Sequence, residues 1–419
     1  MAVTRSALNG FDKKKYGEKN KPLPSFAMVQ KMIPFKQRAK IGAAFEEPVF
    51  VRRAHGVTFA KTTAGTVYAL NNARSIQSVN MSIVGAEVIM REQIAYGAIA
   101  ASEGADGISF GSSFDEAVLG IEESHRFYIE ANALYGKTSI ATVESVAAGD
   151  ASTSKIVTIT KASFAPGLWA QAENALLDNY DVPGGTKLNT NGSISVRSFY
   201  DIDNRKIYLD FSAAADATAC VANSVFVFYQ ASAEVMDGFD SIITNSGSLF
   251  GIDASLYSVW KGNQHDVQST NLTMSAVLAG QTKVTVRGGM GELTVFSNPW
   301  VWQDIADDQS ALRRYGESTV KFVNGAEQIE FQGTGGRIVF VQHPMVKCGE
   351  AFGVQLQHWV RGGESDVVDK LRDASNDDFF HEIPGFAGSE MRNFSSMFMY
   401  TRRPSTCVKW KNIVPRQLQ

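Results

Sequence analysis

The sequence predicts an α+β fold in which one long helix is combined with several antiparallel sheets. Two observations carry this prediction. Residues 113–135 form the dominant helical pattern of the chain, and short β-rich stretches separated by turn residues make up most of the chain beyond residue 137. The 419 residues are 44% hydrophobic and 20% charged. This composition is typical of a globular protein with room for two or three packed units.

The first 40 residues carry ten basic and two acidic side chains, a net charge of +8 in a chain whose total is −3. The rest of the chain therefore carries −11. Prolines and isolated apolar residues without helical spacing predict an extended arm over the first 45 residues. Such an arm can contact nucleic acid, lie across an acidic neighbouring subunit, or be a solvated terminus. Its candidate basic residues are Arg5, Lys13, Lys14, Lys15, Lys19 and Lys21.

From Pro48 onward the sequence predicts a long hairpin that projects from the body. VFVRRAHGVTFAK (49–61) and TVYAL (66–70) are β-rich and flank the turn-like residues 62–65, and residues 76–90 are β-rich again. Basic residues within these strands make them poor core elements, and a projecting hairpin needs a partner to cover its edges. The candidate inter-subunit residues are Phe50, Arg52, Arg53, Phe59 and Lys61.

The long helix is predicted over Ser113–Tyr135, a length of about 35 Å. Ser113 and Glu116 fit a capping box, and Gly136 stands where a left-handed C-terminal cap belongs. Apolar and aromatic side chains recur at helical spacing and predict one buried stripe. The stripe consists of Phe114, Ala117, Val118, Ile121, Tyr128 and Tyr135.

The remainder is predicted to be mostly β-structure. A helix opened by Pro166 covers residues 166–178, short helices lie between residues 234 and 280, and a further helix lies near residues 302–315. Strands are predicted at KIVTIT (155–160), SISVRSF (193–199), RKIYLDF (205–211), NSVFVFY (223–229), TKVTV (282–286), LTVF (293–296), TVKFV (319–323), QIEF (328–331) and RIVFV (337–341). The last three predict an antiparallel meander, with a hairpin turn at residues 333–336.

Signals for catalysis are weak. Gly107–Gly111 matches the G-x-S-x-G pattern with Ser109 as its serine, but no buried strand precedes it and His125 falls within the helix predicted after it. The six histidines are scattered, and His343 with Cys348 is interpreted as a satisfied histidine and an inert thiol. Three distant cysteines predict neither a disulfide framework nor a metal site, and no cofactor is expected. No apolar run is long enough to span a membrane, so a soluble protein made inside a cell is expected.

Three stretches resemble known proteins. The first joins VNMSIVGAEVIMREQIAYGAIAAS (79–102) to SFDEAVLGIEESHRFYIEANALYG (113–136), a strand-rich segment followed by a long helix that ends in Leu-Tyr-Gly. The second is GAEQIEFQGTGGRIVFVQHPMVKCGEAFG (325–353), and the third is FSSMFMYTRRPSTCVKW (394–410). In this order they resemble the major capsid proteins of tailed double-stranded DNA phages, which have the Hong Kong phage type of fold.

The resemblance implies a division of the chain into seven segments. They are an N-terminal arm (1–42), an extended loop lying over a neighbouring subunit (43–78), peripheral-domain strands with the spine helix (79–137), a β-rich inserted or enlarged subdomain (138–235), an axial domain (236–315), peripheral-domain strands and return (316–384), and a C-terminal axial segment (385–419).

The function that the resemblance implies is structural rather than enzymatic. Copies of the chain assemble into hexamers and pentamers of an icosahedral head that encloses double-stranded DNA, with no membrane involved. Portal, scaffolding and decoration proteins are further expected partners, and the protein is expected in the virion after assembly in the host cytoplasm. The alternatives are an encapsulin-like compartment shell, a tail or fibre component, and a serine hydrolase acting through Ser109.

Overall fold

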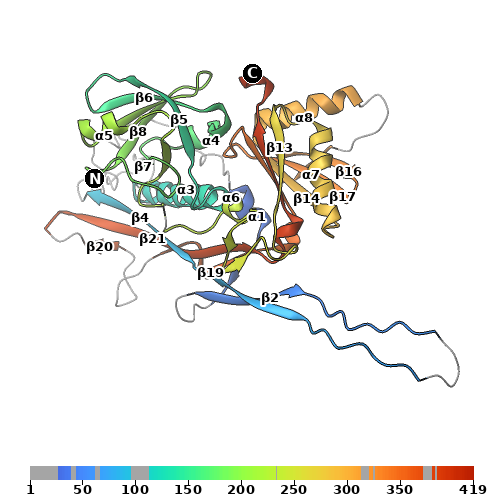
Figure 1. The fold of residues 1–419 in the computed structure, drawn as a ribbon. Helices are drawn as coiled ribbons and strands as arrows, with labels where there is room; N and C mark the ends of the chain where they lie inside the picture. Colours follow the sequence, from blue (N-terminus) through green and yellow to red (C-terminus); the bar gives the residue numbers. More distant parts are fainter. Residues whose placement is uncertain are drawn as a thin grey trace.

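The computed structural model describes the chain in nine stretches, and it combines a long sheet, a β-barrel, a second sheet with two helices, and a projecting hairpin (Figure 1). The long helix α3 (Ser113–Leu134) runs through the middle of these parts. The described residues are 27–38, 44–61, 67–95, 113–232, 234–312, 320–323, 326–370, 380–382 and 385–419.

The long sheet carries α3 on one face. Its central strand is β21 (Gly388–Thr401), which pairs antiparallel with β19, β4 and β20 along different parts of its length. α3 contacts β4, β19 and β21. The other strands of this sheet are β1 (Phe35–Gln37), β4 (Ala86–Ala95), β19 (Trp359–Lys370) and β20 (Phe380–Glu382).

The C-terminal end of α3 is buried on all sides, whereas the sequence predicted a single buried stripe. Ile121 is buried as expected, but so is every residue from Ile129 to Tyr135, including the polar Glu130 and Asn132. The C-terminal end of the helix is enclosed because the long sheet covers one side and the other parts of the molecule cover the rest. The side chains of residues 113–118 lie outside the described part, so the first half of the predicted stripe stays a prediction.

The region after α3 forms a closed barrel with the strand order β10-β5-β6-β9-β8-β7. Apolar side chains such as Val143, Val157 and Ile207 fill its interior and are fully buried. The barrel strands are β5 (Ala141–Ala148), β6 (Ser154–Ile159), β7 (Leu176–Tyr180), β8 (Ile194–Asp201), β9 (Lys206–Phe211) and β10 (Val225–Phe228), and the short helices are η1 (Lys161–Ser163), α4 (Pro166–Trp169) and α5 (Ala214–Ala219).

The helix predicted over residues 166–178 is wrong in its second half. α4 ends at Trp169, and Leu176–Tyr180 forms strand β7 instead. The reason is tertiary, because this segment pairs with β10 on one side and β8 on the other and closes the barrel. Within β7, the buried carboxylate of Asp178 contacts Lys187 at 2.7 Å.

The body of the molecule has three lobes, of which the long sheet with α3 and the barrel are the first two. A seven-stranded sheet with the order β13-β22-β18-β14-β17-β16-β15 forms the third lobe. The predicted meander is confirmed in β15–β17, where Gly333 pairs with Gly336 across a two-residue turn. The elements are α6 (Phe239–Ile242), β11 (Ser248–Leu249), β12 (Ile252–Asp253), β13 (Asn263–Thr270), α7 (Met274–Val286), β14 (Leu293–Ser297), α8 (Pro299–Leu312), β15 (Val320–Val323), β16 (Ala326–Gly333), β17 (Gly336–Gln342), β18 (Glu350–Val354), η3 (Leu356–His358), η4 (Pro404–Thr406), β22 (Val408–Ile413) and η5 (Arg416–Leu418).

The strand predicted at residues 282–286 is wrong, since these residues form the last turn and a half of α7. The helix begins after Thr273, whose side chain accepts a hydrogen bond from the Ala276 amide at 3.3 Å. Its β-branched end stays helical because Val284 is buried against the sheet. Packing therefore outweighs the local β propensity.

The closest approach of α7 to the sheet depends on a glycine. A Cβ at Gly280 would lie 2.5 Å from ring atoms of Trp410. We expect Gly280→Ala to lower the free energy of unfolding by about 1–3 kcal/mol through overpacking, although alanine favours helices by about 1 kcal/mol over glycine. Gly120→Ala in α3 is the matched control, because a Cβ there meets no atom of the described residues within 4 Å.

Chemical denaturation of both variants measures these free energies. The control should be neutral or more stable than the parent by up to about 1 kcal/mol. A shift of the same sign and size in both variants would contradict the packing described for Gly280.

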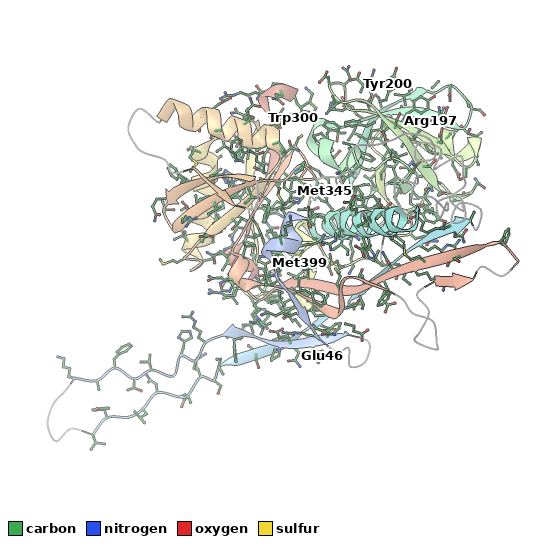
Figure 2. The ribbon with its side chains drawn as sticks, turned by 180° about the vertical axis from the view of Figure 1, so that it is seen from behind. Glu46, Arg197, Tyr200, Trp300, Met345 and Met399 are labelled. Carbon is green, nitrogen blue, oxygen red and sulfur yellow. The ribbon has the colours of Figure 1, made fainter. Side chains whose placement is uncertain are left out.

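The barrel and the seven-stranded lobe meet at a tight backbone contact. The Cys348 amide donates to the Phe164 carbonyl at 2.8 Å, and the Gly349 amide donates to the Ala162 carbonyl at 2.9 Å. Figure 2 shows Met345, which precedes these residues, in the middle of the molecule, while Arg197 lies out on the barrel. The sheet of this lobe also runs across the predicted boundary between residues 315 and 316, because β14 and β17 are paired neighbours within it.

The structure differs from the predicted extended arm over residues 27–38. Residues 1–26 lie outside the described part, but Met28–Met32 forms the short helix α1 and Phe35–Gln37 forms β1, which pairs parallel with β19. Val29 is fully buried and packs in the main core with Ile33. This end of the arm therefore docks on its own subunit.

Candidate functional site

The main candidate surface is the hairpin that leaves the body between β2 (Phe45–Arg52) and β3 (Gln77–Ile83). The two strands pair antiparallel, with Arg52 opposite Gln77. Beyond this pair the chain continues as a long projection away from the three lobes (Figure 1). The strands predicted at residues 49–61 and 66–70 are wrong beyond residue 52, because the described residues of the projection form no strand there.

The two halves of the projection are held together by isolated hydrogen bonds rather than by a regular ladder. The Asn71 amide donates to Thr58 Oγ1 at 2.8 Å, and Asn71 Nδ2 donates to the Val57 carbonyl at the same distance. Nearer the root, the His55 amide donates to the Arg74 carbonyl at 3.2 Å. The predicted turn at residues 62–65 lies outside the described residues.

The projection exposes large apolar side chains. Phe59 is 89% exposed, Val67 97% and Leu70 80%. An exposed apolar cluster of this kind marks a surface that a partner covers. We call these residues, together with Tyr68, the hairpin apolar cluster.

The candidate inter-subunit residues are all on the surface of the subunit. Phe50 is 67% exposed on β2, and Arg53, Phe59 and Lys61 are exposed on the projection. Arg52 is exposed too, but its guanidinium lies 5.6 Å from the centre of the Tyr257 ring of the same chain. Their contact with a second subunit stays a prediction.

The root of the hairpin is fixed by a charge cluster that the sequence pattern did not predict. Glu47 on β2 accepts hydrogen bonds from Tyr400 and from Arg402, whose Nη2 is 2.7 Å away, and Arg38 Nη1 lies at 3.1 Å. Burial alone would raise the pKa of Glu47, but the Tyr400 hydroxyl and the Arg402 charge outweigh it and hold the pKa below its usual value. The cluster therefore ties the hairpin to the end of β21.

A second buried cluster connects the arm to α3. Glu130 accepts hydrogen bonds from the amides of Val29 at 2.6 Å and Gln30 at 3.3 Å, which are first-turn donors of α1. His343 Nε2 lies 2.8 Å from the same carboxylate, and both side chains are almost fully buried. His343 is therefore satisfied by Glu130. The feature of the sequence that could have indicated this cluster is Glu130, an acidic residue near the C-terminal end of the long predicted helix.

A third cluster joins α6 to two strands of the third lobe. Lys409 Nζ lies 2.8 Å from Glu350 Oε1 and also contacts Asp240. Burial lowers the pKa of Lys409, but these two carboxylates outweigh the burial and raise it. The neighbouring Lys347 donates to the Ser139 carbonyl at 2.7 Å, and burial lowers its pKa. These groups hold elements together inside the molecule.

The predicted helix caps are described in part. Ser113 is the first residue of α3, and the side chains of Ser113 and Glu116 lie outside the described part, so the capping box stays a prediction. Gly136 has φ +49, and a Cβ there would lie 2.3 Å from the Met236 carbonyl oxygen. A residue with a side chain is strained in this conformation and has no room there.

The residues considered for hydrolysis are not brought together where the structure describes them. Ser109 lies outside the described residues. His125 is fully buried and its Nε2 lies 2.8 Å from Ser395 Oγ on β21, so it contributes to packing between α3 and the long sheet. Burial lowers the pKa of His125 to about 4.

This pKa predicts a loss of stability in acid. The unfolded imidazole takes up a proton near pH 6.5, whereas the folded one stays neutral down to about pH 4. The unfolded state therefore binds more protons in this window, and stability falls as the pH drops through it. Between pH 7 and pH 5 we expect His125 to account for a loss of about 2 kcal/mol in the free energy of unfolding.

Chemical denaturation at both pH values, with His125→Gln as the comparison, measures this contribution. The variant should lose about 2 kcal/mol less than the parent over the same interval. Equal losses would show that the folded protein protonates His125 as readily as the unfolded chain does.

The part of the chain that the structure describes contains no metal-ligand cluster and no membrane-spanning helix. Its His, Cys, Asp and Glu side chains form no group of three or more that could hold a metal ion. Cys220, Cys348 and Cys407 are buried free thiols. None of the described helices combines the length and the apolarity that crossing a bilayer requires.

Comparisons with known proteins identify the fold. No family model and no curated protein sequence matches the chain. Among solved structures, the capsid protein of cyanophage A-1(L) has a TM-score of 0.53 at 10% identity, over 98% of this chain and 99% of that one. The native GTA particle capsid (TM-score 0.47, 8% identity, 97% of each chain) and the SrpI encapsulin of Synechococcus elongatus (0.48, 7%, 100% and 99%) are more distant.

The fold assignment rests on the cyanophage structure, whose similarity extends over almost the whole of both chains. Its low sequence identity limits the conclusion to architecture. The chain has the fold of the major capsid proteins of tailed phages, the Hong Kong phage type.

Proposed function

We propose that this chain is the major capsid protein of a tailed phage, and that its copies assemble into the hexamers and pentamers of an icosahedral head. The hairpin apolar cluster carries this proposal. Phe59, Val67 and Leu70 are exposed on the long projection of a chain that has a capsid fold. In a single subunit these side chains stay exposed to solvent, whereas identical subunits in a closed shell can cover one another's projections.

Each part of the subunit has a role in this proposal. The projection between β2 and β3 is the extended loop that lies over a neighbour, and α3 is the spine helix of the peripheral domain. The lobe with the seven-stranded sheet is the axial domain near the capsomer centre. The barrel of residues 141–228 is an inserted or enlarged subdomain.

The proposed content of the shell is double-stranded DNA, bound without sequence specificity. The net charge of −11 on the body beyond residue 40 repels DNA, and the basic arm offsets this repulsion. Portal, scaffolding and decoration proteins are the further partners of the proposal. Assembly takes place in the host cytoplasm, and the finished protein is in the virion.

Sedimentation velocity of the purified 419-residue protein, followed by analysis of the contents, tests this function. We expect closed particles of several megadaltons that enclose no protein cargo. Closed particles that contain a protein cargo and no DNA would favour the encapsulin-like alternative. A small oligomer at every concentration would favour a tail or fibre component and would overturn the proposal.

A further inference from the structure

An acidic pocket lies between α3, the barrel and the start of the described chain. It has a volume of about 770 Å³. Glu122 and Glu123 of α3 are part of its lining, and so is Glu173, which follows α4. The apolar part of the lining comes from Phe127 and Tyr128 of α3, with Met90 of β4.

The lining has an excess of negative charge. Four glutamates and one arginine face the pocket, a net charge of −3. Glu130 is already engaged by the two α1 amides and by His343. Glu122 and Glu123 are half-buried and Glu173 is exposed. An occupant of this pocket should therefore combine positive charge with apolar side chains.

The N-terminal end of α1 lies beside this pocket. Ala27 is part of the lining, and α1 follows it directly. The residues that precede Ala27 have the required chemistry. Residues 13–26 contain five lysines and one glutamate, and their apolar side chains are Tyr16, Leu23 and Phe26. Opposite charges at short range favour this pairing, the more so where the wall is partly buried.

The other nearby segment is less suited to the pocket. Residues 96–112 connect β4 to α3, but they contain Glu103 and Asp106 and no lysine or arginine. Like charges would oppose their entry beside Glu122 and Glu123. The arm is therefore the better occupant on charge.

The reach of the arm is sufficient within one subunit. Glu122 and Glu130 are eight residue steps apart on the helix, about 12 Å along the axis. The six residue steps from Lys21 to Ala27 can span about 20 Å when extended, and Pro22 and Pro24 favour an extended chain. Lys19 and Lys21 can thus reach Glu122 and Glu123 without help from a neighbouring copy.

We propose that residues 13–26 of the arm bind in this pocket of their own subunit, with Lys19 and Lys21 against Glu122 and Glu123. The arm continues α1 along the acidic side of α3 toward the N-terminal end of the helix. Because the arm has more positive charge than the pocket has negative charge, docking leaves some of it free for other contacts. This proposal does not depend on shell formation.

Cysteine cross-linking of the full chain tests the docking directly. Lys19→Cys is combined with Glu123→Cys and mildly oxidised, and the linked peptides are identified by mass spectrometry. We expect a disulfide within one chain. A disulfide formed between chains would overturn docking on the same subunit, and the absence of any disulfide would overturn the proposal altogether.

Charge reversal supplies an independent readout. In Glu122→Arg/Glu123→Arg we expect endoproteinase Lys-C to cleave after Lys15 and Lys19 at least about tenfold faster, which corresponds to about 1.4 kcal/mol of lost binding. Glu234→Arg, an exposed reversal outside the pocket, is the matched control and should leave the rate unchanged. Equal rates in all three proteins would contradict the proposal. An unchanged thermal unfolding midpoint shows that the double variant is folded.

Discussion

Replacing residues 53–76 with an Asn-Gly turn is expected to abolish shell assembly while the subunit stays folded. Arg52 and Gln77 are paired in the β2–β3 ladder, so a two-residue turn can close the hairpin at this point. The three lobes, the Glu47 cluster and the Glu130 cluster all remain. The variant should unfold at nearly the same temperature as the parent and sediment as a small species.

The expected size of this effect depends on the hairpin apolar cluster. Burying one large apolar side chain contributes about 1.5–3 kcal/mol. Losing Phe59, Tyr68 and Leu70 would therefore remove about 4–9 kcal/mol from each contact, a factor of at least about a thousand in subunit association. Electron microscopy and sedimentation velocity, run on the same preparation, measure the loss.

Point variants distinguish the loss of the apolar side chains from the shortening of the projection. Phe59→Ser/Leu70→Ser keeps the projection but removes much of its apolar surface, and should also prevent assembly. Tyr200→Ser is the matched control, because Tyr200 is 58% exposed on the barrel (Figure 2) and lies outside the hairpin. Normal shells from the truncated protein would show that the hairpin makes no assembly contact.

Glu130→Ala should strongly destabilise the body of the subunit. It leaves the amides of Val29 and Gln30 without their buried acceptor, and it leaves His343 without its partner. Each buried donor that loses its acceptor costs about 1–3 kcal/mol, so the loss of these three contacts should cost about 3–5 kcal/mol. We expect the free energy of unfolding to fall by this amount in chemical denaturation.

Glu130→Gln is the control for this substitution. Its amide oxygen can still accept one of the α1 amides, so the loss should be less than half of that in Glu130→Ala. Limited proteolysis near Ala27 provides a second measurement, because α1 should detach from α3 in Glu130→Ala first. Equal stability of Glu130→Ala and the parent would contradict the role of this cluster.

Elements that depend on local pattern could be predicted from the sequence. The long helix is found within one residue of its predicted C-terminal end, because its periodicity and the glycine that follows it act locally. Barrel strands β6, β8, β9 and β10 and the β15–β17 meander are also where their β-rich runs predicted them. In each of these, propensity and packing favour the same conformation.

Elements that depend on distant partners could not be predicted. The end of α7 is rich in β-branched residues but stays helical because Val284 packs into the core. Residues 53–61 look like a strand, but they pair with no strand among the described residues of the subunit. The clusters around Glu47 and Glu130 join residues more than 200 positions apart, which a single sequence cannot pair.

Cryo-electron microscopy of the assembled 419-residue protein tests the proposed shell function most directly. We predict closed icosahedral shells of hexamers and pentamers, in which Phe59, Tyr68 and Leu70 of each hairpin are buried against a neighbouring subunit. A protein that stays monomeric at high concentration, or a shell whose hairpins contact no neighbouring subunit, would contradict this function.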